Sequence, residues 1–379
     1  MAGQRDAETA RIDPDRQERA KIYGRIRRRL FLIELGTDAV FALVVLLSGI
    51  SANLRQAASA VSGERVVVVA LYFVVIYVAY SLVICPLSFY SGYSLPHRFD
   101  LSTQNLVGWL VDWAKSLAIA LVFGLILVEI AYYLLAVTPD FWWLVMGLVV
   151  LFFNVILANV APIFLVPIFY KMTPLEAGAL AKRLVDLAAK AGARVKGVYL
   201  LNMSSRTKAA NAALMGLGNT RRIVLGDTVL GRYTVDEIET LFAHELGHHV
   251  HSDIPKTVVL QSVGTLAALY VASIVLERSV SLLGLASIAD IATLPLLALI
   301  LGAVSLILLP LGNTLSRWFE YQADEYAVRM TGNAQAFRDA MTKLANQNLA
   351  EVEPSAWVEF LLYDHPAIGK RIKMAEKYL

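Results

Sequence analysis

The 379-residue sequence has a single cysteine and few charged side chains. Cys85 has no other cysteine with which to form an intrachain disulfide, and one thiol is too few for a cysteine metal site. Charged residues make up 17% of the chain and the formal net charge is +3, so nucleic-acid binding is not expected. The opening stretch is polar and charged, and we expect no cleavable signal peptide. The candidate catalytic and metal-binding residues are therefore the six histidines and the carboxylates.

Apolar residues are what the sequence has in excess. They make up 57% of the chain, against roughly 45–50% in soluble globular proteins, and the mean hydropathy is +0.58. Six apolar runs reach or approach the ~20 residues that cross a bilayer as a helix. The chain is therefore predicted to be a mainly α-helical, multi-pass integral membrane protein. The predicted spans are 30–50, 66–84, 117–137, 141–169, 258–276 and 294–311.

The charge pattern predicts the orientation of the chain in the membrane. The polar N-terminal arm ends in a basic cluster, Arg27 to Arg29, which the positive-inside rule places in the cytoplasm. An even number of spans returns the C-terminus to the same side. The predicted parts are a polar, basic arm (1–29), four spans (30–170) with an interfacial loop (87–116), a first long polar segment (171–255), two spans (256–311) and a C-terminal helical segment (312–379).

The polar segment 171–255 has the pattern of a small α+β unit. A helix is predicted from residue 172 to Gly192, with Thr173 as its cap. Thr234 and Glu237 form the sequence of a capping box at the start of a further helix. Short strands are predicted at 195–203, 211–216 and 221–230, with a turn at Gly218 and Asn219.

That further helix contains TLFAHELGHHVH, residues 240–251. His244 and His248 are four residues apart and therefore share one helix face, with Glu245 beside them. Two neutral imidazoles at this spacing can bind one Zn²⁺, and a neighbouring carboxylate can take a proton from a water molecule on the metal. His249 and His251 point elsewhere by helical period. The stretch is a zinc-hydrolase signature and predicts one Zn²⁺ per chain.

A catalytic zinc site needs a third protein ligand, and FEYQADEY provides the best candidate. Glu320 and Asp324 are four residues apart, so on a helix the first can bind zinc while the second accepts the free N–H of a ligand histidine. Glu325 lies off that face. The sixth apolar span runs directly into this stretch and directs it toward the same membrane surface.

Six segments together resemble the type I CAAX prenyl endopeptidase family, a group of integral membrane zinc metalloproteases classed as gluzincins. The HELGH motif alone would indicate only a metalloprotease, whereas the EYQAD and DHP segments in their proper order make the resemblance specific. The segments are LPHRFDLSTQNLVGWLVDWAK (95–115), APIFLVPIFYKMTPLEAG (161–178), NAALMGLGNTRRIVLGDTVL (211–230), HELGH (244–248), SRWFEYQADEYA (316–327) and SAWVEFLLYDHPAIGKRI (355–372).

The resemblance implies a role for each matching residue. His365 taken alone fits an ordinary loop histidine equally well, and Asn211 also lies on a predicted strand whose edge could pair with an extended peptide. The implied roles are zinc ligands for His244, His248 and Glu320, general base and acid for Glu245, support of a ligand histidine for Asp324, oxyanion stabilisation for His365, and substrate-groove contacts for Asn211 and Arg371.

The resemblance also implies that the spans form a barrel around a water-filled intramembrane chamber. Polar side chains in or beside the spans could line such a chamber or bond to one another, since unpaired polar groups are costly in lipid. Eukaryotic members have seven spans, so the first is expected to be absent here, which would leave the barrel open or narrower on one side. The polar side chains in question are Glu34, Asp38, Glu129, Asn154, Asn159 and Gln261.

The expected function is zinc-dependent hydrolysis of a peptide or protein substrate that can be C-terminally prenylated, in contact with the lipid bilayer. A general membrane protease that removes misfolded or hydrophobic peptides is the alternative. A metal transporter would have no use for Glu245 at its position, and a noncatalytic scaffold usually loses the base or a ligand. The sequence keeps the base and all three expected ligands.

Overall fold

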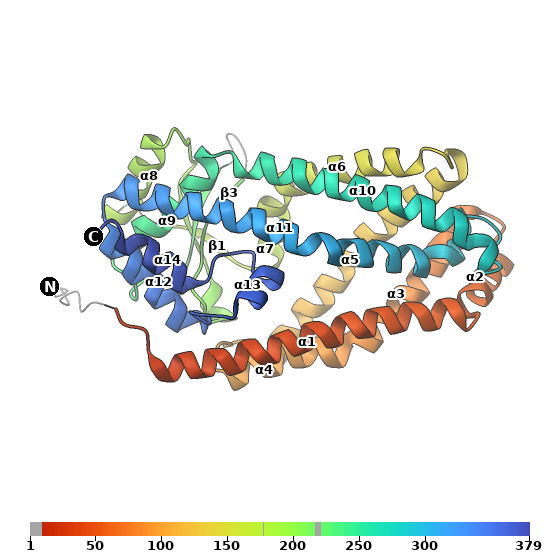
Figure 1. Ribbon diagram of the computed structural model, residues 1–379, viewed down its shortest axis with the longest axis horizontal. Helices are drawn as coiled ribbons and strands as arrows, with labels where there is room; N and C mark the ends of the chain where they lie inside the picture. The colour runs from red at the N-terminus through yellow and green to blue at the C-terminus, as the bar shows by residue number, and fades with distance from the viewer. Residues whose placement is uncertain (1–9, 177, 217–220) are drawn as a thin grey trace.

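The computed structural model describes residues 10–176, 178–216 and 221–379. The described chain is elongated and mainly helical. The sheet and most of the shorter helices lie at one end, and the long helices extend from them to the other end, where the short helix α2 (Ile50–Val61) lies (Figure 1). The turn predicted at Gly218 and Asn219, and residues 1–9 of the predicted arm, lie outside the described residues.

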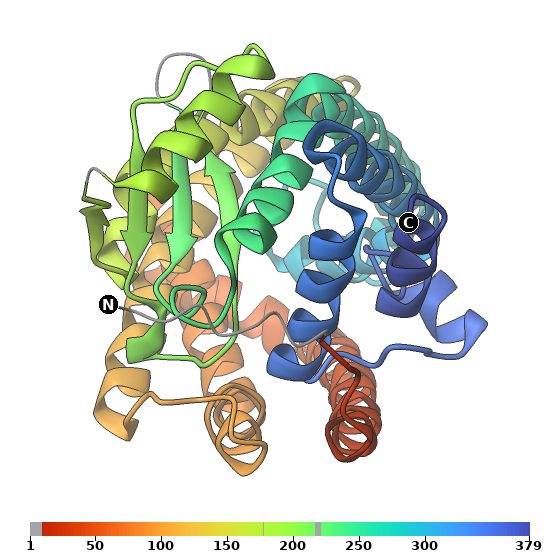
Figure 2. The same cartoon turned by 90° about the vertical axis from the view of Figure 1, so that its left-hand side faces the viewer.

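Six helical segments of the described chain are long and apolar enough to cross a membrane, as the sequence predicts. Seen along the long axis, α1 lies at the bottom in red, the teal helix α10 lies toward the top, and the green strands of the sheet lie on the left (Figure 2). The helices that form these spans are α1 (Pro14–Leu47), α3 (Arg65–Phe89), α5 (Leu106–Val137), α6 (Trp142–Val160), α10 (Asp253–Leu282) and α11 (Leu294–Thr331).

Two of the spans continue past proline through a π-helical turn. Helix α3 passes through Tyr90–Ser94 into α4 (Leu95–Arg98), and α6 passes through Ala161–Leu165 into α7 (Val166–Phe169). A proline has no backbone N–H to donate, and the wider π turn accommodates the missing bond. The stretch predicted as an interfacial loop, 87–116, is therefore mostly helical, because α5 also begins at Leu106.

Helix α1 begins sixteen residues before its predicted apolar span, at Pro14 instead of Leu30. The side chain of Asp13 accepts hydrogen bonds from the backbone N–H groups of Asp15 and Arg16, and proline suits the first helical position. Asn346, near the C-terminus, fixes this start by accepting a hydrogen bond from Asp13 N at 3.0 Å. Most of the predicted arm is therefore helix that continues out of the membrane.

Polar contacts join the segments at the end of the spans far from the sheet. The hydroxyl of Ser51, in α2 (Ile50–Val61), donates to the carbonyl of Ala292 at 2.7 Å and lies 2.5 Å from the hydroxyl of Tyr72. Tyr132 bonds with Thr293 at 2.8 Å, at the end of the 3₁₀ turn Ile291–Thr293. All these hydroxyls are buried within an apolar cluster and are paired, which limits the cost of burying them.

Polar groups inside the spans differ in how they are satisfied. The hydroxyl of Tyr80 donates to Asp38 at 2.8 Å and so joins α3 to α1, whereas Asn159 donates to the carbonyl of Val155 in its own helix. Glu129 has a buried carboxylate oxygen without a hydrogen-bond partner among the described residues. Bonding between and within helices therefore accounts for Asp38 and Asn159.

The four described strands form one mixed sheet in the order β1-β2-β4-β3. Strand β2 runs parallel to β4, and the outer strands β1 and β3 run antiparallel to their neighbours. Packing of α8 (Ala179–Lys190) and α9 (Val235–Val250) with the sheet buries the apolar core of this unit. The strands are β1 (Met172–Pro174), β2 (Val198–Leu201), β3 (Ala212–Met215) and β4 (Arg222–Gly226).

The helix predicted from residue 172 begins later than expected. Residues Met172–Pro174 form the edge strand β1, which pairs with β2, and α8 spans Ala179–Lys190. Proline is tolerated at a sheet edge, where its missing N–H costs no ladder bond. The predicted stop at Gly192 is confirmed, because this residue follows α8 with φ = 70°, a conformation that favours glycine.

Three short helices close the chain around a loop that carries His365: α12 (Ala334–Asn348), α13 (Ala356–Leu362) and α14 (Ile368–Glu376). Glu359, in α13, accepts hydrogen bonds from Ala367 N at 3.1 Å and from Lys370 Nζ at 2.7 Å. Its carboxylate is buried and lies between the loop and α14. This one side chain therefore joins both ends of the loop.

We expect Glu359→Ala to lower the free energy of unfolding by about 1–3 kcal/mol, because a buried backbone N–H loses its acceptor. Burial raises the pKa of Glu359, but the bonds from Lys370 and Ala367 outweigh it and hold the pKa below its usual 4.5. The stabilisation is therefore complete above about pH 4.5 and is lost as the pH falls through the lowered pKa. Denaturation of the purified protein at pH 7 and at acidic pH measures both effects.

Glu353→Ala is the matched control for this substitution. Glu353 pairs with Lys373 at 3.2 Å, but both side chains are largely exposed, so its loss should change the free energy of unfolding by less than about 1 kcal/mol. An equal loss in the two variants would contradict the role of Glu359.

Candidate metal centre

Helix α9 presents the two motif histidines side by side. Thr234 caps it by accepting a hydrogen bond from Glu237 N, and the Glu237 side chain accepts from Thr234 N, which confirms the predicted capping box. His244 and His248 lie one turn apart, with their Nε2 atoms 3.2 Å from each other. Their rings are nearly perpendicular, with centroids 4.8 Å apart. Both imidazoles therefore direct a nitrogen to the same point.

Helix α11 brings a carboxylate to that point. Glu320 Oε2 lies 3.3 Å from His244 Nε2, and Glu320 Oε1 lies 3.3 Å from His248 Nε2. The approach depends on Gly247, because a Cβ at this position would lie 2.8 Å from the Cα of Ala323. The glycine of HELGH thus lets α9 and α11 pack closely enough for three ligands to converge.

The three side chains form a metal site. One potential ligand atom from each of His244, His248 and Glu320 lies within 4.8 Å of the other two, the only such group among the residues that the structure describes. Glu320 Oε2 is buried and lacks a hydrogen-bond partner in that part of the chain. A buried carboxylate oxygen is costly without a partner, so the donor set fits a bound cation.

Two buried charges hold His244 in place. Asp324 Oδ1 lies 2.8 Å from His244 Nδ1, and Arg371 donates to both oxygens of Asp324 at 2.5 and 2.8 Å. Burial alone would lower the pKa of His244, but the carboxylates of Asp324 and Glu320 outweigh it and raise the pKa to about 10. The two carboxylates therefore make the surroundings of His244 favourable to positive charge.

A further carboxylate, which the sequence reasoning missed, holds His248. Asp253 Oδ2 lies 3.0 Å from His248 Nδ1, and Lys256 donates to its other oxygen at 3.4 Å. Asp253 is buried at the first turn of α10, after Ser252 adopts φ = 57°. Asp253 lies only five residues after His248 in the sequence. Helical spacing does not relate these two positions, because α9 ends between them, at Val250.

Glu245 and His365 reach the centre from different segments. Glu245 is partly buried and lines a cavity of about 510 Å³ together with His248 and Glu320. His365, in the loop after α13, places Nε2 at 3.2 Å from Glu320 Oε1. Asp364 accepts a hydrogen bond from its other ring nitrogen at 2.9 Å, which raises the pKa of His365 although burial opposes it.

The two residues expected in the substrate groove lie in different surroundings. Asn211 is exposed directly before β3, an outer strand of the described sheet. Leu214 of β3, and Gly216 just after it, line the same cavity as Glu245. Asn211 itself is not among the residues lining that cavity. The side chain of Arg371 is 10% exposed, and its guanidinium donates to Asp324 beside the metal centre.

Comparison with known proteins agrees with this geometry. Residues 174–379 match the model of peptidase family M48, and residues 6–171 match a model described as the CAAX prenyl protease N-terminal part with five membrane helices. Within the second match, the described residues hold four candidate spans.

Relatives match over most of the chain. It is 30% identical over 362 residues to the uncharacterized metalloprotease YhfN of Bacillus subtilis, covering 94% of this chain and 85% of that one. It is 30% identical over 320 residues to CAAX prenyl protease 1 of Saccharomyces cerevisiae, covering 77% and 68%. The crystal structure of S. mikatae Ste24p has the same fold, with a TM-score of 0.84 at 24% identity over 96% of this chain and 89% of that one. The chain belongs to peptidase family M48 and is a multi-pass membrane metalloprotease.

Proposed function

We propose that the chain is a zinc-dependent endopeptidase that cleaves peptides at the cytoplasmic end of its membrane spans. The observation that carries this proposal is the convergence of His244, His248 and Glu320 beside Glu245 in one cavity. Three protein ligands with room for a further ligand are typical of catalytic zinc, and imidazole nitrogens favour zinc over magnesium or calcium. The basic residues at the start of α1 support the cytoplasmic orientation.

Each polar residue around the metal centre has a role in the proposed hydrolysis. Zinc, when bound, would supply Lewis acidity that polarises the scissile carbonyl and lowers the pKa of water toward ~7. Glu245 takes a proton from the attacking water and returns it to the leaving amine. His365 donates a hydrogen bond to the carbonyl oxygen as negative charge develops on it. Asp324 and Asp253 hold the two ligand histidines in the orientation that metal binding requires.

The exposed edge of β3 is suited to holding the substrate. An edge strand offers unpaired backbone groups, to which an extended peptide can add as a further strand. We expect Asn211, at the start of this edge, to contact the peptide. Arg371 contributes indirectly, because its contact with Asp324 keeps the nearby His244 oriented.

For the substrate we propose hydrophobic peptides, including peptides with a prenylated C-terminus. The match to the CAAX prenyl protease N-terminal model and the similarity to yeast CAAX prenyl protease 1 support a prenyl substrate. The name of the similar Bacillus protein, uncharacterized metalloprotease, does not state a substrate. A general protease for hydrophobic or misfolded membrane peptides therefore stays the alternative.

Glu245→Gln tests the proton transfer. We expect the cleavage rate to fall by about 10²–10⁴-fold, because the amide cannot accept the proton, while zinc binding is retained. Peptide cleavage and elemental analysis of the purified variant measure the two effects. Glu239→Gln is the control, since Glu239 lies on the same helix but pairs with Arg183 away from the centre. A wild-type rate in the Glu245 variant would refute the assignment.

Glu320→Gln tests the ligand set, and His244→Ala tests it independently. Each should leave the purified protein with much less than one zinc per chain, because two protein ligands hold zinc far more weakly than three. Glu325→Gln, five residues along α11, is the matched control and should keep its zinc, since Glu325 bonds to Arg329 and Tyr378 instead. Full zinc content in both ligand variants would show that the metal lies elsewhere.

A pair of peptides separates the two substrate classes. One carries a farnesyl group on a cysteine near its C-terminus, and its twin has the same sequence without the lipid. Selective prenyl recognition predicts a kcat/KM at least tenfold higher for the farnesylated peptide. Equal kcat/KM values for the two peptides in the wild type, with both activities lost in the Glu245→Gln variant, would instead support the general hydrophobic protease.

A further inference from the structure

A separate cavity, which we call the basic pocket, lies where the fourth span meets the β1 edge of the sheet. It has a volume of about 590 Å³ and shares no lining residue with the cavity beside the metal centre. Strand β1 is at the opposite edge of the sheet from β3, so the basic pocket and the proposed peptide edge are separate sites. Its lining includes four cations and no carboxylate: Lys115, Lys171, Arg206 and Arg222.

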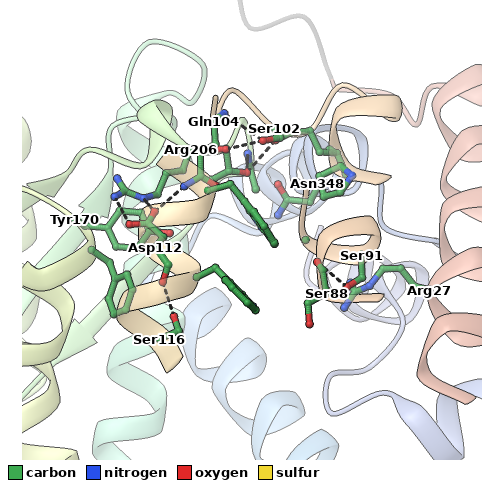
Figure 3. A pocket seen from close by; sticks show the side chains of 18 of the residues that line it. Arg27, Ser88, Ser91, Ser102, Gln104, Asp112, Ser116, Tyr170, Arg206 and Asn348 are labelled. Atoms are coloured by element: carbon green, nitrogen blue, oxygen red, sulfur yellow. Dashed lines mark hydrogen bonds and ion pairs between the residues drawn. The ribbon is translucent and has the colours of Figure 1, made fainter. Parts of the chain in front are cut away.

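Two of the four cations of the basic pocket, Lys115 and Arg206, share one carboxylate partner. Asp112 pairs with Arg206 at 2.7 Å, as Figure 3 shows for the neighbouring cavity that shares this wall, and lies 3.7 Å from Lys115. No carboxylate in the described parts of the chain forms an ion pair with Lys171 or Arg222. Arg222 also has a buried Nε without a hydrogen-bond partner there. The pocket therefore offers donors and charge for an anion.

Aromatic rings hold the cations of the pocket in place. Arg206 lies over Tyr170 at 4.9 Å, and Arg222 lies over Tyr199 at 5.3 Å. Cation–aromatic contacts leave the outer N–H groups of a guanidinium free to donate. Arg222 is therefore positioned to form paired hydrogen bonds with a phosphate, whereas Arg206 already donates to Asp112 and Ser205.

The pocket also lies at the end of the fourth candidate span, where the surface of the membrane is expected. Lys171 follows the fourth span by two residues, and Ile168, in the last turn of that span, lines the pocket with 41% of its surface exposed. Val111 and Phe164 leave 46% and 64% of their surface exposed on the adjoining helices α5 and α6–α7. An anion with apolar chains could therefore place its charge in the pocket and its chains along these helices.

We propose that the basic pocket binds the phosphate headgroup of an anionic phospholipid. Lys171 and Arg222, which have no carboxylate partner in the described chain, attract the phosphate, and the exposed apolar side chains next to the pocket favour a lipid over a free phosphate ion. A bound headgroup would tie the β1–β2 side of the sheet to the membrane surface. The proposal requires neither the metal nor peptide cleavage.

The test is a lipid titration of the full-length protein in detergent, followed by native mass spectrometry. Phosphatidylglycerol and phosphatidylcholine with identical acyl chains are compared. We expect the wild type to bind phosphatidylglycerol more tightly, and Lys171→Gln/Arg222→Gln to bind it about 30-fold more weakly, as loss of two cations near an anionic lipid predicts. Phosphatidylcholine binding should not change.

Matched variants and a competitor complete the test. Lys182→Gln/Lys190→Gln removes the same charge from exposed positions on α8 and should bind like the wild type. Lys171→Arg/Arg222→Lys keeps the charge and should retain most of the binding, which separates the loss of charge from misfolding. Equal loss in the pocket and α8 variants, or no preference for phosphatidylglycerol in the wild type, would overturn the proposal. Displacement of the lipid by millimolar inorganic phosphate would overturn the lipid assignment in favour of a free anion.

Discussion

The close contact between α9 and α11 is the constraint on which the metal centre depends. Gly247 faces Ala323 with no room for a side chain, and this approach places Glu320 within 3.3 Å of both His244 and His248. A larger residue at position 247 would separate the helices, and three ligands can hold one ion only within a few ångströms of each other. The glycine of the HELGH motif therefore acts through packing, whereas its neighbours act through chemistry.

Two membrane spans deliver the acidic groups that surround the histidines. Helix α11 runs without interruption from the membrane to Glu320 and Asp324, and α10 begins with Asp253. Each ligand histidine thus receives a carboxylate on its second ring nitrogen from a helix that continues into the spans. Because such partners orient the ligands and tune their basicity, the protease site and the membrane helices form one structural unit.

Local patterns determined most of the helical fold in advance. Runs of apolar residues long enough to cross a bilayer predict spans whatever the rest of the chain does, because the backbone must satisfy its own hydrogen bonds in lipid. The boundaries were less predictable. Helix α1 starts at Pro14 because Asn346 and Asp13 fix its first turn, and residues Met172–Pro174 form a strand because β2 lies beside them. Both outcomes depend on contacts between segments far apart in the sequence.

In the metal centre, too, local sequence patterns determine some features and contacts between distant segments determine others. The sequence by itself determined the metal motif, since helical periodicity places His244 and His248 on one face and gives Asp324 a fixed spacing from the expected third ligand. Only the tertiary structure decided that Asp253 holds His248 and that Arg371 faces Asp324. It also brought four cations from separate elements into the basic pocket. The physical reason is that spacing along a helix fixes directions within that helix alone, whereas contacts between elements are set by how their surfaces pack.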